Sequence, residues 1–302
     1  MEKEFYSNGK LLLSGEYAIL DGALGLAIPT SYGQSLHVAP TESGFLEWTS
    51  FDETNEIWFS AKFDLNDLRV VSTSDDAMAK TLTSLLLEAN ALNPLLLTDS
   101  NGFQIETHLT FPKSWGLGTS STLINNLAQW ARVDAYHLLR NAFGGSGYDI
   151  ACAQHNSPIT YQLVDGEPQV EQIDFDPIFK ESLFFVHLNQ KQSSKEAITN
   201  YREQQFDKSK LIKEVSDITK KMIRASTLSG FETLMEEHET LLSRVLKMEP
   251  VKQRLFPDYF GMVKSLGAWG GDFVLATGDE KTISYFKEKG YESVVPYARM
   301  IL

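Results

Sequence analysis

The stretch Phe111-Pro-Lys-Ser-Trp-Gly-Leu-Gly-Thr-Ser-Ser-Thr-Leu123 decides how the rest of the chain is interpreted. It follows the run Phe103–Leu109, which predicts a β-strand because apolar and polar residues alternate along it. It precedes apolar side chains that recur at helical spacing and predict one helix over residues 119–139. The stretch therefore predicts a loop that joins a strand to a helix.

The backbone of this loop suits an anion. Gly116 and Gly118 carry no side chain, so a ligand can lie directly against the main chain. The first amides of a helix have no intrahelical partner and lie at the positive end of its dipole. These properties predict a phosphate site over residues 116–121, although a capped helix after a tight turn explains the same residues equally well. No GxxxxGK[ST] occurs, which excludes a Walker-type loop, and no GxGxxG follows a strand, which disfavours a Rossmann site.

The composition limits the possible partners. The chain has 302 residues, with 27 Lys and Arg against 40 Asp and Glu, so its formal charge is 27 − 40 = −13. This acidic balance argues against nucleic acid and anionic membranes as partners. The single cysteine, Cys152, excludes an intramolecular disulfide and fits a reducing compartment. The sequence begins without an apolar leader and has no apolar run of about 18 residues, so we expect a cytoplasmic, soluble protein.

An earlier segment, Asn8-Gly-Lys-Leu-Leu-Leu-Ser-Gly-Glu-Tyr-Ala-Ile-Leu-Asp-Gly22, places a lysine in an apolar run. Its apolar residues predict strand pieces at 11–13 and 18–20 around a bend. A charge in such a run needs a partner or a route to water. Lys10 is therefore either a strand-edge lysine that reaches solvent or a cation aimed at phosphate or an active-site carboxylate.

A second glycine-rich turn, Phe143-Gly-Gly-Ser-Gly-Tyr-Asp149, follows the predicted loop helix. Asp149 falls in the first turn of a helix expected over residues 148–155. Taken alone, the pattern favours an aspartate that is simply stabilised by the helix dipole. The aromatic residues Trp48, Trp58 and Phe59 are expected in the core or on a sheet face, and we assign them no role.

The C-terminal part predicts a strand, a helical region and an α/β ending. Two lysines and two serines in Asn189-Gln-Lys-Gln-Ser-Ser-Lys-Glu-Ala197, between a strand and a helix, fit an anion site or a solvated loop equally well. We expect the charged residues 236–239 to be solvated on a helix face. The segment Lys264-Ser-Leu-Gly-Ala-Trp-Gly-Gly-Asp-Phe-Val-Leu-Ala276 and the strand and helix after it predict half of a ferredoxin-like layer. The expected helices span residues 208–225, 230–246 and 251–266.

Three segments resemble, in order, the motifs of the GHMP kinases, a superfamily that includes galactokinase, homoserine kinase, mevalonate kinase and phosphomevalonate kinase. Residues 8–22 resemble the N-terminal signature, Pro112-x-x-x-Gly-Leu-Gly-Thr-Ser-Ser121 the ATP loop, and residues 264–276 the third glycine-rich motif. The resemblance implies an α+β GHMP kinase fold. It implies an ATP-binding domain like ribosomal protein S5 domain 2 over residues 1–180 and a ferredoxin-like C-terminal domain over 181–302.

The resemblance also implies a role for individual residues. Asp149 would accept the proton of the substrate hydroxyl, and Lys10 would neutralise phosphate charge. ATP and Mg²⁺ are the implied cofactors, and Ser120 would offer its hydroxyl to the metal. The implied ATP-binding residues are Pro112, Gly116, Leu117, Gly118, Thr119, Ser120 and Ser121. The weaker candidates for acceptor binding are Glu16, Lys191, Ser194, Lys195, Gly270 and Gly271.

Departures from the family pattern bear on the substrate. Leu138 stands where mevalonate kinase has a Mg²⁺-binding glutamate, and Gly145-Ser-Gly-Tyr-Asp149 looks more like phosphomevalonate kinase. The resemblance thus favours a small anionic acceptor, mevalonate or phosphomevalonate, and a monomer or homodimer. Trp269 replaces a small residue of the third motif, which predicts an altered pocket floor. A mevalonate diphosphate decarboxylase and a catalytically silent sensor on the same scaffold remain alternatives, although the presence of both Lys10 and Asp149 argues against the sensor.

Overall fold

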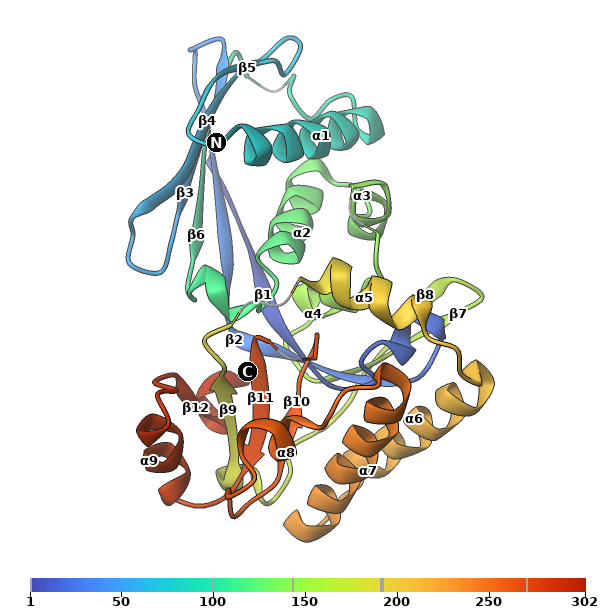
Figure 1. Ribbon diagram of the computed structural model, residues 1–302. Coiled ribbons are helices and arrows are strands. Elements are labelled where there is room, and N and C mark those ends of the chain that lie inside the picture. Colours follow the sequence, from blue (N-terminus) through green and yellow to red (C-terminus); the bar gives the residue numbers. More distant parts are fainter. Residues whose placement is uncertain (1, 99, 143, 191–192, 270) are drawn as a thin grey trace. The chain divides into compact units, whose positions relative to one another are not determined.

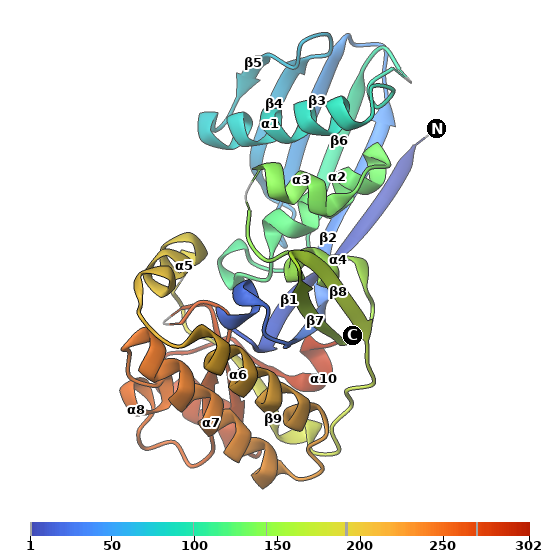
Figure 2. The ribbon, with the colours of Figure 1, turned by 90° about the vertical axis from the view of Figure 1, so that its right-hand side faces the viewer.

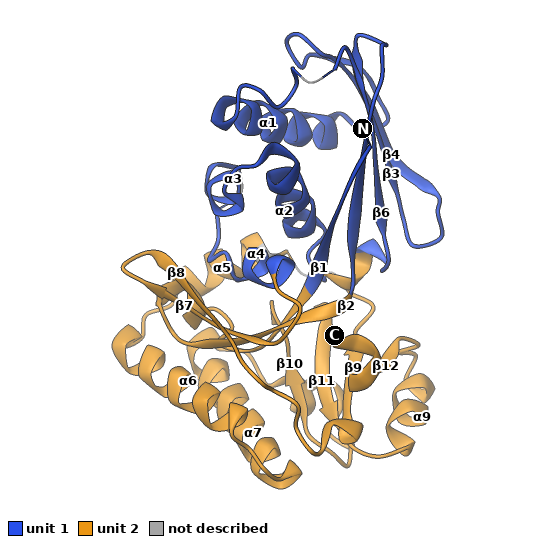
Figure 3. Ribbon diagram, turned by 180° about the vertical axis from the view of Figure 1, so that it is seen from behind, with its two compact units in different colours: residues 1–9, 32–113, 117–154 blue, residues 10–31, 114–116, 155–302 orange. Residues whose placement is uncertain are grey.

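The computed structural model describes residues 2–302 except 99, 143, 191–192 and 270. The chain forms two compact units (Figure 3): unit 1 holds residues 1–9, 32–113 and 117–154, and unit 2 holds residues 10–31, 114–116 and 155–302. The predicted division into 1–180 and 181–302 is continuous in sequence, unlike these units, and stays a prediction. In the described part of the chain, no helix is both long enough and apolar enough to cross a bilayer.

Two long strands run through both units. These are β1 (Lys3–Ser14) and β2 (Gly25–Pro40), which pair with each other. The C-terminal half of β2 pairs antiparallel with β6 (Phe103–Leu109) in unit 1, and its first residues pair antiparallel with β7 (Ile159–Val164) in unit 2. The predicted strand at Phe103–Leu109 is confirmed.

Unit 1 is a sheet with helices on one face. Its strand order is β5-β4-β3-β6-β2, and Figure 2 shows α1, α2 and α3 lying together over this sheet. The core between them contains Trp48, Phe59, Phe103, Leu86 and Leu127, so two of the three aromatic residues without an assigned role are core residues as expected. The remaining elements are β3 (Phe45–Phe51), β4 (Ile57–Asp64), β5 (Val70–Thr73), α1 (Asp76–Leu92), α2 (Thr119–Ala131), α3 (Ala135–Ala142) and α4 (Tyr148–Gln154).

The single helix expected over residues 119–139 is wrong, because the chain forms α2 and α3 instead. Arg132 ends α2 in the left-handed conformation, with φ 56°, and its N–H donates to the carbonyl of Gln129. Asp134 then opens α3, because its carboxylate accepts a hydrogen bond of 2.8 Å from the N–H of Tyr136. Helical periodicity continues across the break, so the apolar pattern did not reveal it.

Unit 2 contains a second, antiparallel sheet in the order β10-β11-β9-β12 (Figure 1). With the helices between β9 and β10 and one helix between β11 and β12, this is the ferredoxin-like arrangement that the sequence predicts. The hairpin of β7 turns at Asp165 and Gly166, both with positive φ, as two-residue hairpins require. The elements are β8 (Glu167–Gln172), β9 (Leu183–His187), α5 (Ser194–Glu203), α6 (Lys208–Ile223), α7 (Leu228–Leu246), α8 (Val251–Leu255), β10 (Val263–Ser265), β11 (Phe273–Thr277), α9 (Lys281–Glu288), β12 (Val294–Pro296) and α10 (Tyr297–Met300), with short 3₁₀ turns at η1 (Ala18–Asp21), η2 (Lys113–Trp115) and η3 (Lys180–Ser182).

Two expectations for unit 2 are wrong. The helix expected over residues 251–266 ends at Leu255, because Phe256 precedes a proline and is disfavoured in the helical region. The chain then forms β10, which pairs with β11. The strand expected at residues 18–20 is the 3₁₀ turn η1, which follows Tyr17 at φ 60° and ends at Gly22 in the left-handed region.

Candidate active site

The predicted phosphate loop leads into α2 in unit 1. Gly118 precedes the helix with φ 98°, and no side chain caps its first turn. The hydroxyls of Ser121 and Thr122 donate to the carbonyl of Gly118, at 2.9 and 3.1 Å, and so leave the first amides to another partner. An uncapped helix start of this kind can receive an anion at its N–H groups.

An apolar cavity of about 170 Å³ lies beside this helix start, within unit 1. Thr119 and Ser120 are among its polar lining residues, and the ammonium of Lys113 lies 4.3 Å from the ring centroid of Trp58. Apolar pockets with a few polar groups at one edge are typical of sites for small molecules and cofactors. The sequence assigns Trp58 no role, because most aromatic residues lie in the core or on a sheet face. The other lining residues are Gln34, Trp48, Ser50, Phe59, Met78, Thr81, Leu82, Leu85 and Leu123.

Asp149 lies half-buried in the first turn of α4, also in unit 1. The turn before it contains Gly144, Gly145 and Gly147, whose φ angles of 72°, 102° and 90° are in the range that glycine adopts without strain. Helix α4 packs on α2, where the side-chain amide of Asn125 donates to the carbonyl of Ala153 at 3.3 Å. Asp149 is therefore carried by an element fixed to the helix that begins at the phosphate loop. Leu138, at the position of the glutamate of mevalonate kinase, is fully buried in α3.

The other predicted residues of the loop are Pro112, which is partly buried, and Leu117, which is fully buried. Gly116 belongs to unit 2 and has φ 66°. A Cβ atom built there would lie 2.5 Å from the carboxyl carbon of Asp272. The Asp272 side chain thus occupies the space that a Cβ at Gly116 would take, and the binding of ATP at this glycine stays a prediction.

Lys10 lies on β1, at the start of the part of β1 that belongs to unit 2. Its side chain is partly exposed, whereas the following Leu11, Leu12 and Leu13 are buried. The expected strand at residues 11–13 is therefore confirmed. Among the acceptor candidates, Lys191 and Gly270 lie outside the described residues. Helix α5 begins at Ser194, Lys195 is exposed in its first turn, and Gly271 is buried.

Helix α5 has a cap of its own. The hydroxyl of Ser193 accepts a hydrogen bond of 3.3 Å from the N–H of Glu196. This bond satisfies one of the amides that an anion would use. Lys195 consequently remains a better anion candidate than the helix backbone.

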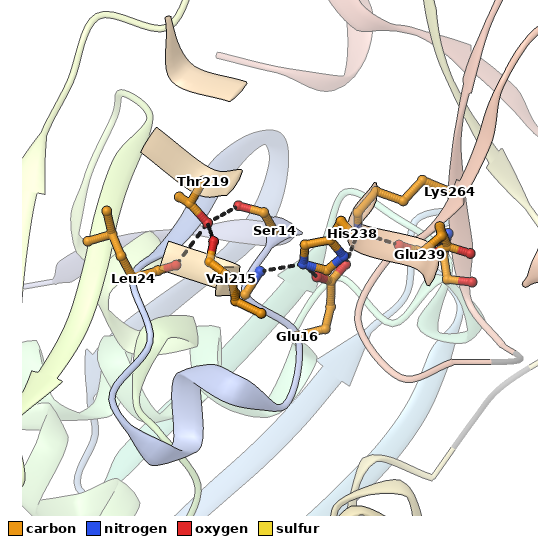
Figure 4. A network of polar contacts seen from close by, with 10 residues as sticks. Ser14, Glu16, Leu24, Val215, Thr219, His238, Glu239 and Lys264 are labelled. Carbon is orange, nitrogen blue, oxygen red and sulfur yellow. Dashed lines mark hydrogen bonds and ion pairs between the residues drawn. The ribbon is translucent and has the colours of Figure 1, made fainter. Parts of the chain in front are cut away.

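A network of buried polar side chains in unit 2 was missed by sequence reasoning (Figure 4). Glu16 is 1% exposed, and one of its carboxylate oxygens accepts a hydrogen bond from the ammonium of Lys264. Its other oxygen lies 3.2 Å from Nε2 of His238. Glu239, next along α7, accepts a hydrogen bond of 3.0 Å from the N–H of Ser265. Glu16 is engaged in this network, and its part in acceptor binding stays a prediction.

The expectation that residues 236–239 are solvated is wrong for His238 and Glu239, which are 0% and 1% exposed. Both lie on the apolar stripe of α7 with Phe231, Met235 and Leu242, at spacings of three and four residues. That spacing is visible in the sequence and would have found them. Their neighbours Glu236 and Glu237 are exposed.

Burial governs the protonation of this network. It raises the pKa of the Glu239 carboxyl to about 8, although Lys264 beside it acts in the opposite direction. Burial also raises the pKa of Glu16 against the opposing charge of Lys264. Burial and then the Lys264 charge hold the pKa of His238 well below its usual value. A neutral His238 fits its geometry, because Nε2 accepts a hydrogen bond of 3.2 Å from the N–H of Gly15.

Trp269, which replaces a small residue of the third motif, lies in the core of unit 2. The residue is 3% exposed and packs into the core of unit 2 with Tyr17, Tyr201 and Leu242. The backbone N–H of Trp269 donates to the hydroxyl of Tyr17 at 2.9 Å. The Trp269 side chain thus packs against residues of α5, α6 and α7, and it is accommodated in the core of unit 2.

No protein-family model and no curated protein matches the sequence. Solved structures do match the fold. Mevalonate kinase from Methanococcus jannaschii has a TM-score of 0.71 at 17% identity, over 97% of this chain and 96% of that one. Streptococcus pneumoniae phosphomevalonate kinase, in complex with phosphomevalonate and AMPPNP, has a TM-score of 0.68 at 16% identity over 95% of each chain. Lactococcus lactis galactokinase, complexed with galactose, has a TM-score of 0.69 at 14% identity, over 97% of this chain and 92% of that one. The chain has the GHMP kinase fold that its three motifs predict.

Proposed function

We propose that this chain is an ATP-dependent small-molecule kinase that transfers the γ-phosphoryl group of ATP to an alcohol or phosphate acceptor. One observation carries the proposal. The uncapped start of α2, the apolar cavity beside it and the Asp149 turn are all built around the same helix of unit 1. Solved structures of the same fold include kinases for mevalonate, phosphomevalonate and galactose, which supports this class of reaction.

The residues at the start of α2 fit a nucleoside triphosphate. The apolar cavity with Trp58 and Met78 suits a purine ring, and the amides of residues 119–121 suit its phosphates. No group of three or more His, Cys, Asp or Glu residues in the described ranges is placed to hold a metal ion. Mg²⁺, which prefers oxygen ligands, would thus rely on phosphate and water oxygens and on the exposed Ser120 hydroxyl. When bound, it would neutralise charge on the phosphate oxygens.

The chain's own residues would do the rest by positioning and charge. Asp149 would orient the acceptor hydroxyl and take its proton while the hydroxyl oxygen bonds to the γ-phosphorus and ADP leaves. Lys10 would neutralise the charge of the transferred phosphoryl group. Lys195, with Lys191, would hold an anionic acceptor.

We propose mevalonate or phosphomevalonate as the acceptor. Leu138 in place of a carboxylate and the Gly145-Ser-Gly-Tyr-Asp149 turn favour the phosphorylated alcohol. ATP consumption measured over mevalonate, phosphomevalonate, homoserine and sugar alcohols tests this choice. Release of CO₂ from mevalonate diphosphate would instead identify a decarboxylase, and an absence of turnover with every compound would leave the silent sensor.

The proposed base can be tested by Asp149→Asn. The amide keeps the shape of the side chain but cannot accept the hydroxyl proton, so we expect kcat to fall about 10²–10⁴-fold. The KM for ATP should change little, because backbone amides and the metal would hold the nucleotide. Steady-state kinetics with the best acceptor measures both constants.

A matched control distinguishes a base from an ordinary helix-start aspartate. Asp76 occupies the first turn of α1 and does not line the cavity. Asp76→Asn should keep normal turnover. If Asp149→Asn also keeps a normal kcat, Asp149 is not the catalytic base and the proposed mechanism lacks one. Substitution of Gly118 is a poorer test, because φ 98° strains any side chain and would confound folding with binding.

A further inference from the structure

One polar side chain stands at an apolar position of unit 1. In β2, Gln34 follows the period of two that turns Leu36 and Val38 into the core. Gln34 is 1% exposed and lines the apolar cavity at the start of α2. A glutamine in such a place needs hydrogen-bond partners, because a buried amide without them is costly.

Helix α2 holds this glutamine at two points. The side-chain amide of Asn126 donates to the backbone carbonyl of Gln34 at 2.9 Å. The hydroxyl of Thr122 donates to Oε1 of the Gln34 side chain at 2.7 Å. Thr122 and Asn126 are both fully buried, so water does not compete for these bonds. The protein itself therefore sets the position of the glutamine.

The other end of the amide has no use within the protein. Among the described residues, Nε2 of Gln34 has no hydrogen-bond partner. If the amide turned by 180° about its last bond, Nε2 would donate to Thr122 and Oε1 would be left over instead. In either orientation, one end of a buried amide is available to a molecule in the cavity. Native structures contain few buried polar groups without a partner, and a ligand explains this one.

The size and lining of the cavity limit what this ligand is. Its volume of about 170 Å³ is close to that of an apolar cavity of about 150 Å³ that holds one benzene ring. It is well below the range of about 300–1,000 Å³ that encloses a drug-sized molecule. Trp48, Trp58 and Phe59 supply aromatic walls. The cavity therefore suits one flat aromatic ring system, with the rest of the molecule outside it.

One edge of adenine complements a carboxamide. Adenine has a donor, its 6-amino group, beside the acceptor N7, and glutamine pairs with the two through Oε1 and Nε2. The oxygen of a carboxamide has two lone pairs, so Oε1 of Gln34 can accept from adenine while it accepts from Thr122. Guanine presents two acceptors at the same edge, O6 and N7. Its O6 would face Oε1 with no proton between them.

We propose that Gln34 is the residue that selects adenine over guanine. Its Nε2 donates to N7 of the base, and its Oε1 accepts from the 6-amino group. The inference rests on the proposed function, because it takes the cavity as the site of the purine ring. It goes beyond that function by assigning the choice of base to one side chain. Guanine is rejected because it leaves buried polar groups of the site unmatched.

The test measures the choice of base apart from turnover. Calorimetry of the full chain, without an acceptor, gives the Kd values of Mg·ATP and Mg·GTP. Gln34→Met keeps an unbranched side chain of similar length but cannot donate. Thr122 keeps a partner in this variant, because its hydroxyl also lies 3.1 Å from the carbonyl of Gly118. Thr81→Val is the matched control: Thr81 lines the same cavity, but its hydroxyl already donates to the carbonyl of Ala77 at 3.0 Å.

We expect the wild type and Thr81→Val to bind Mg·ATP about ten-fold or more tightly than Mg·GTP. In Gln34→Met, weaker binding of Mg·ATP should reduce this preference to about two-fold or less. An unchanged preference in Gln34→Met, an equal loss in Thr81→Val, or no preference in the wild type would overturn the inference. In the last case, phosphoryl transfer from ATP and GTP alike would leave the proposed function standing. A wild type that binds neither nucleotide would remove the proposed function and the inference with it.

A change in the ligand tests the same contact without a substitution. Purine riboside triphosphate lacks the 6-amino group but keeps N7. The wild type should bind its Mg²⁺ complex about three-fold or more weakly than Mg·ATP, and Gln34→Met should bind the two equally. Equal binding of the two by the wild type would show that the 6-amino group is not recognised and would overturn the inference.

A second variant serves if Gln34→Met does not fold. Gln34→Asn keeps a buried carboxamide, but its side chain is one methylene shorter and cannot reach both Thr122 and the base. It should lose the preference for Mg·ATP over Mg·GTP as Gln34→Met does. A full preference in Gln34→Asn would contradict the assignment of the base contact to Gln34.

Discussion

At the scale of single residues, the notable feature is a set of ionisable groups that unit 2 buries together. The charges of Lys264 and Glu16 act on Glu239, and its pKa is raised to about 8 mainly because it is buried. A buried carboxylate is costly unless it is paired, and Lys264 already pairs with Glu16. Glu239 is thus protonated at neutral pH and still accepts the hydrogen bond from Ser265.

This predicts a specific dependence of stability on pH. Between about pH 4.5 and 8 the folded chain keeps a proton on Glu239 that the unfolded chain releases, so stability falls as pH rises through this window. Glu239→Gln keeps the acceptor oxygen but does not titrate. We expect thermal melts from pH 6 to 8.5 to show a smaller decline of Tm in Glu239→Gln than in the wild type. The exposed Glu236→Gln should decline as the wild type does, and identical declines in all three proteins would contradict the assignment.

At the scale of elements, α2 organises unit 1. Its first turn is the proposed phosphate site, its neighbour α4 carries Asp149, and its side chains Thr119, Ser120 and Leu123 line the apolar cavity. Strand β4 supplies Trp58 to the same cavity, and α1 supplies Met78. The purine ring and the phosphates of one nucleotide could therefore be held by elements of a single unit.

This arrangement predicts that Trp58→Ala weakens nucleotide binding. Loss of an aromatic face against a base typically costs about 1–3 kcal/mol, so we expect the KM for ATP to rise about ten-fold with kcat nearly unchanged. Ile57, its neighbour on β4, is 61% exposed and does not line the cavity, so Ile57→Ala serves as the control. Equal KM values for ATP in both variants would show that the purine ring does not bind against Trp58.

At the scale of the whole molecule, the chain passes repeatedly between its two units. It crosses after residues 9, 31, 113, 116 and 154, and β1 and β2 each contribute to both units. A strand that runs through two units cannot lose its pairing in one without disturbing its hydrogen-bonded continuation in the other. The third crossing and the fourth enclose the short segment 114–116 that His187 binds.

We therefore expect the two units to unfold together in one cooperative transition. Scanning calorimetry would then give a calorimetric enthalpy equal to the van't Hoff enthalpy, the usual criterion for two-state unfolding. Two resolved transitions would show instead that the units are energetically independent. Mg·ATP at 100 times its Kd should add about 2.7 kcal/mol to the free energy of unfolding. The single Tm should rise accordingly.

The resemblance of three motifs to a known family predicted the fold, and local patterns in the sequence located individual elements. Alternation of period two located the strand at Phe103–Leu109, and the Asp165-Gly166 pair located a hairpin. The glycines around residues 116, 145 and 267 marked turns with positive φ. These features depend on a residue and its near neighbours along the chain, so they can be recognised without knowing what packs against them.

Only the tertiary structure decided which of these residues meet. Helical periodicity continued across the break at Arg132, and nothing local showed that Glu239 faces Lys264 or that Trp58 faces the start of α2. Nothing local showed that a side chain at position 116 would collide with Asp272, a residue 156 positions later in the chain. The physical reason is that periodicity reports which face of an element is apolar, whereas burial and pairing depend on the element that covers that face.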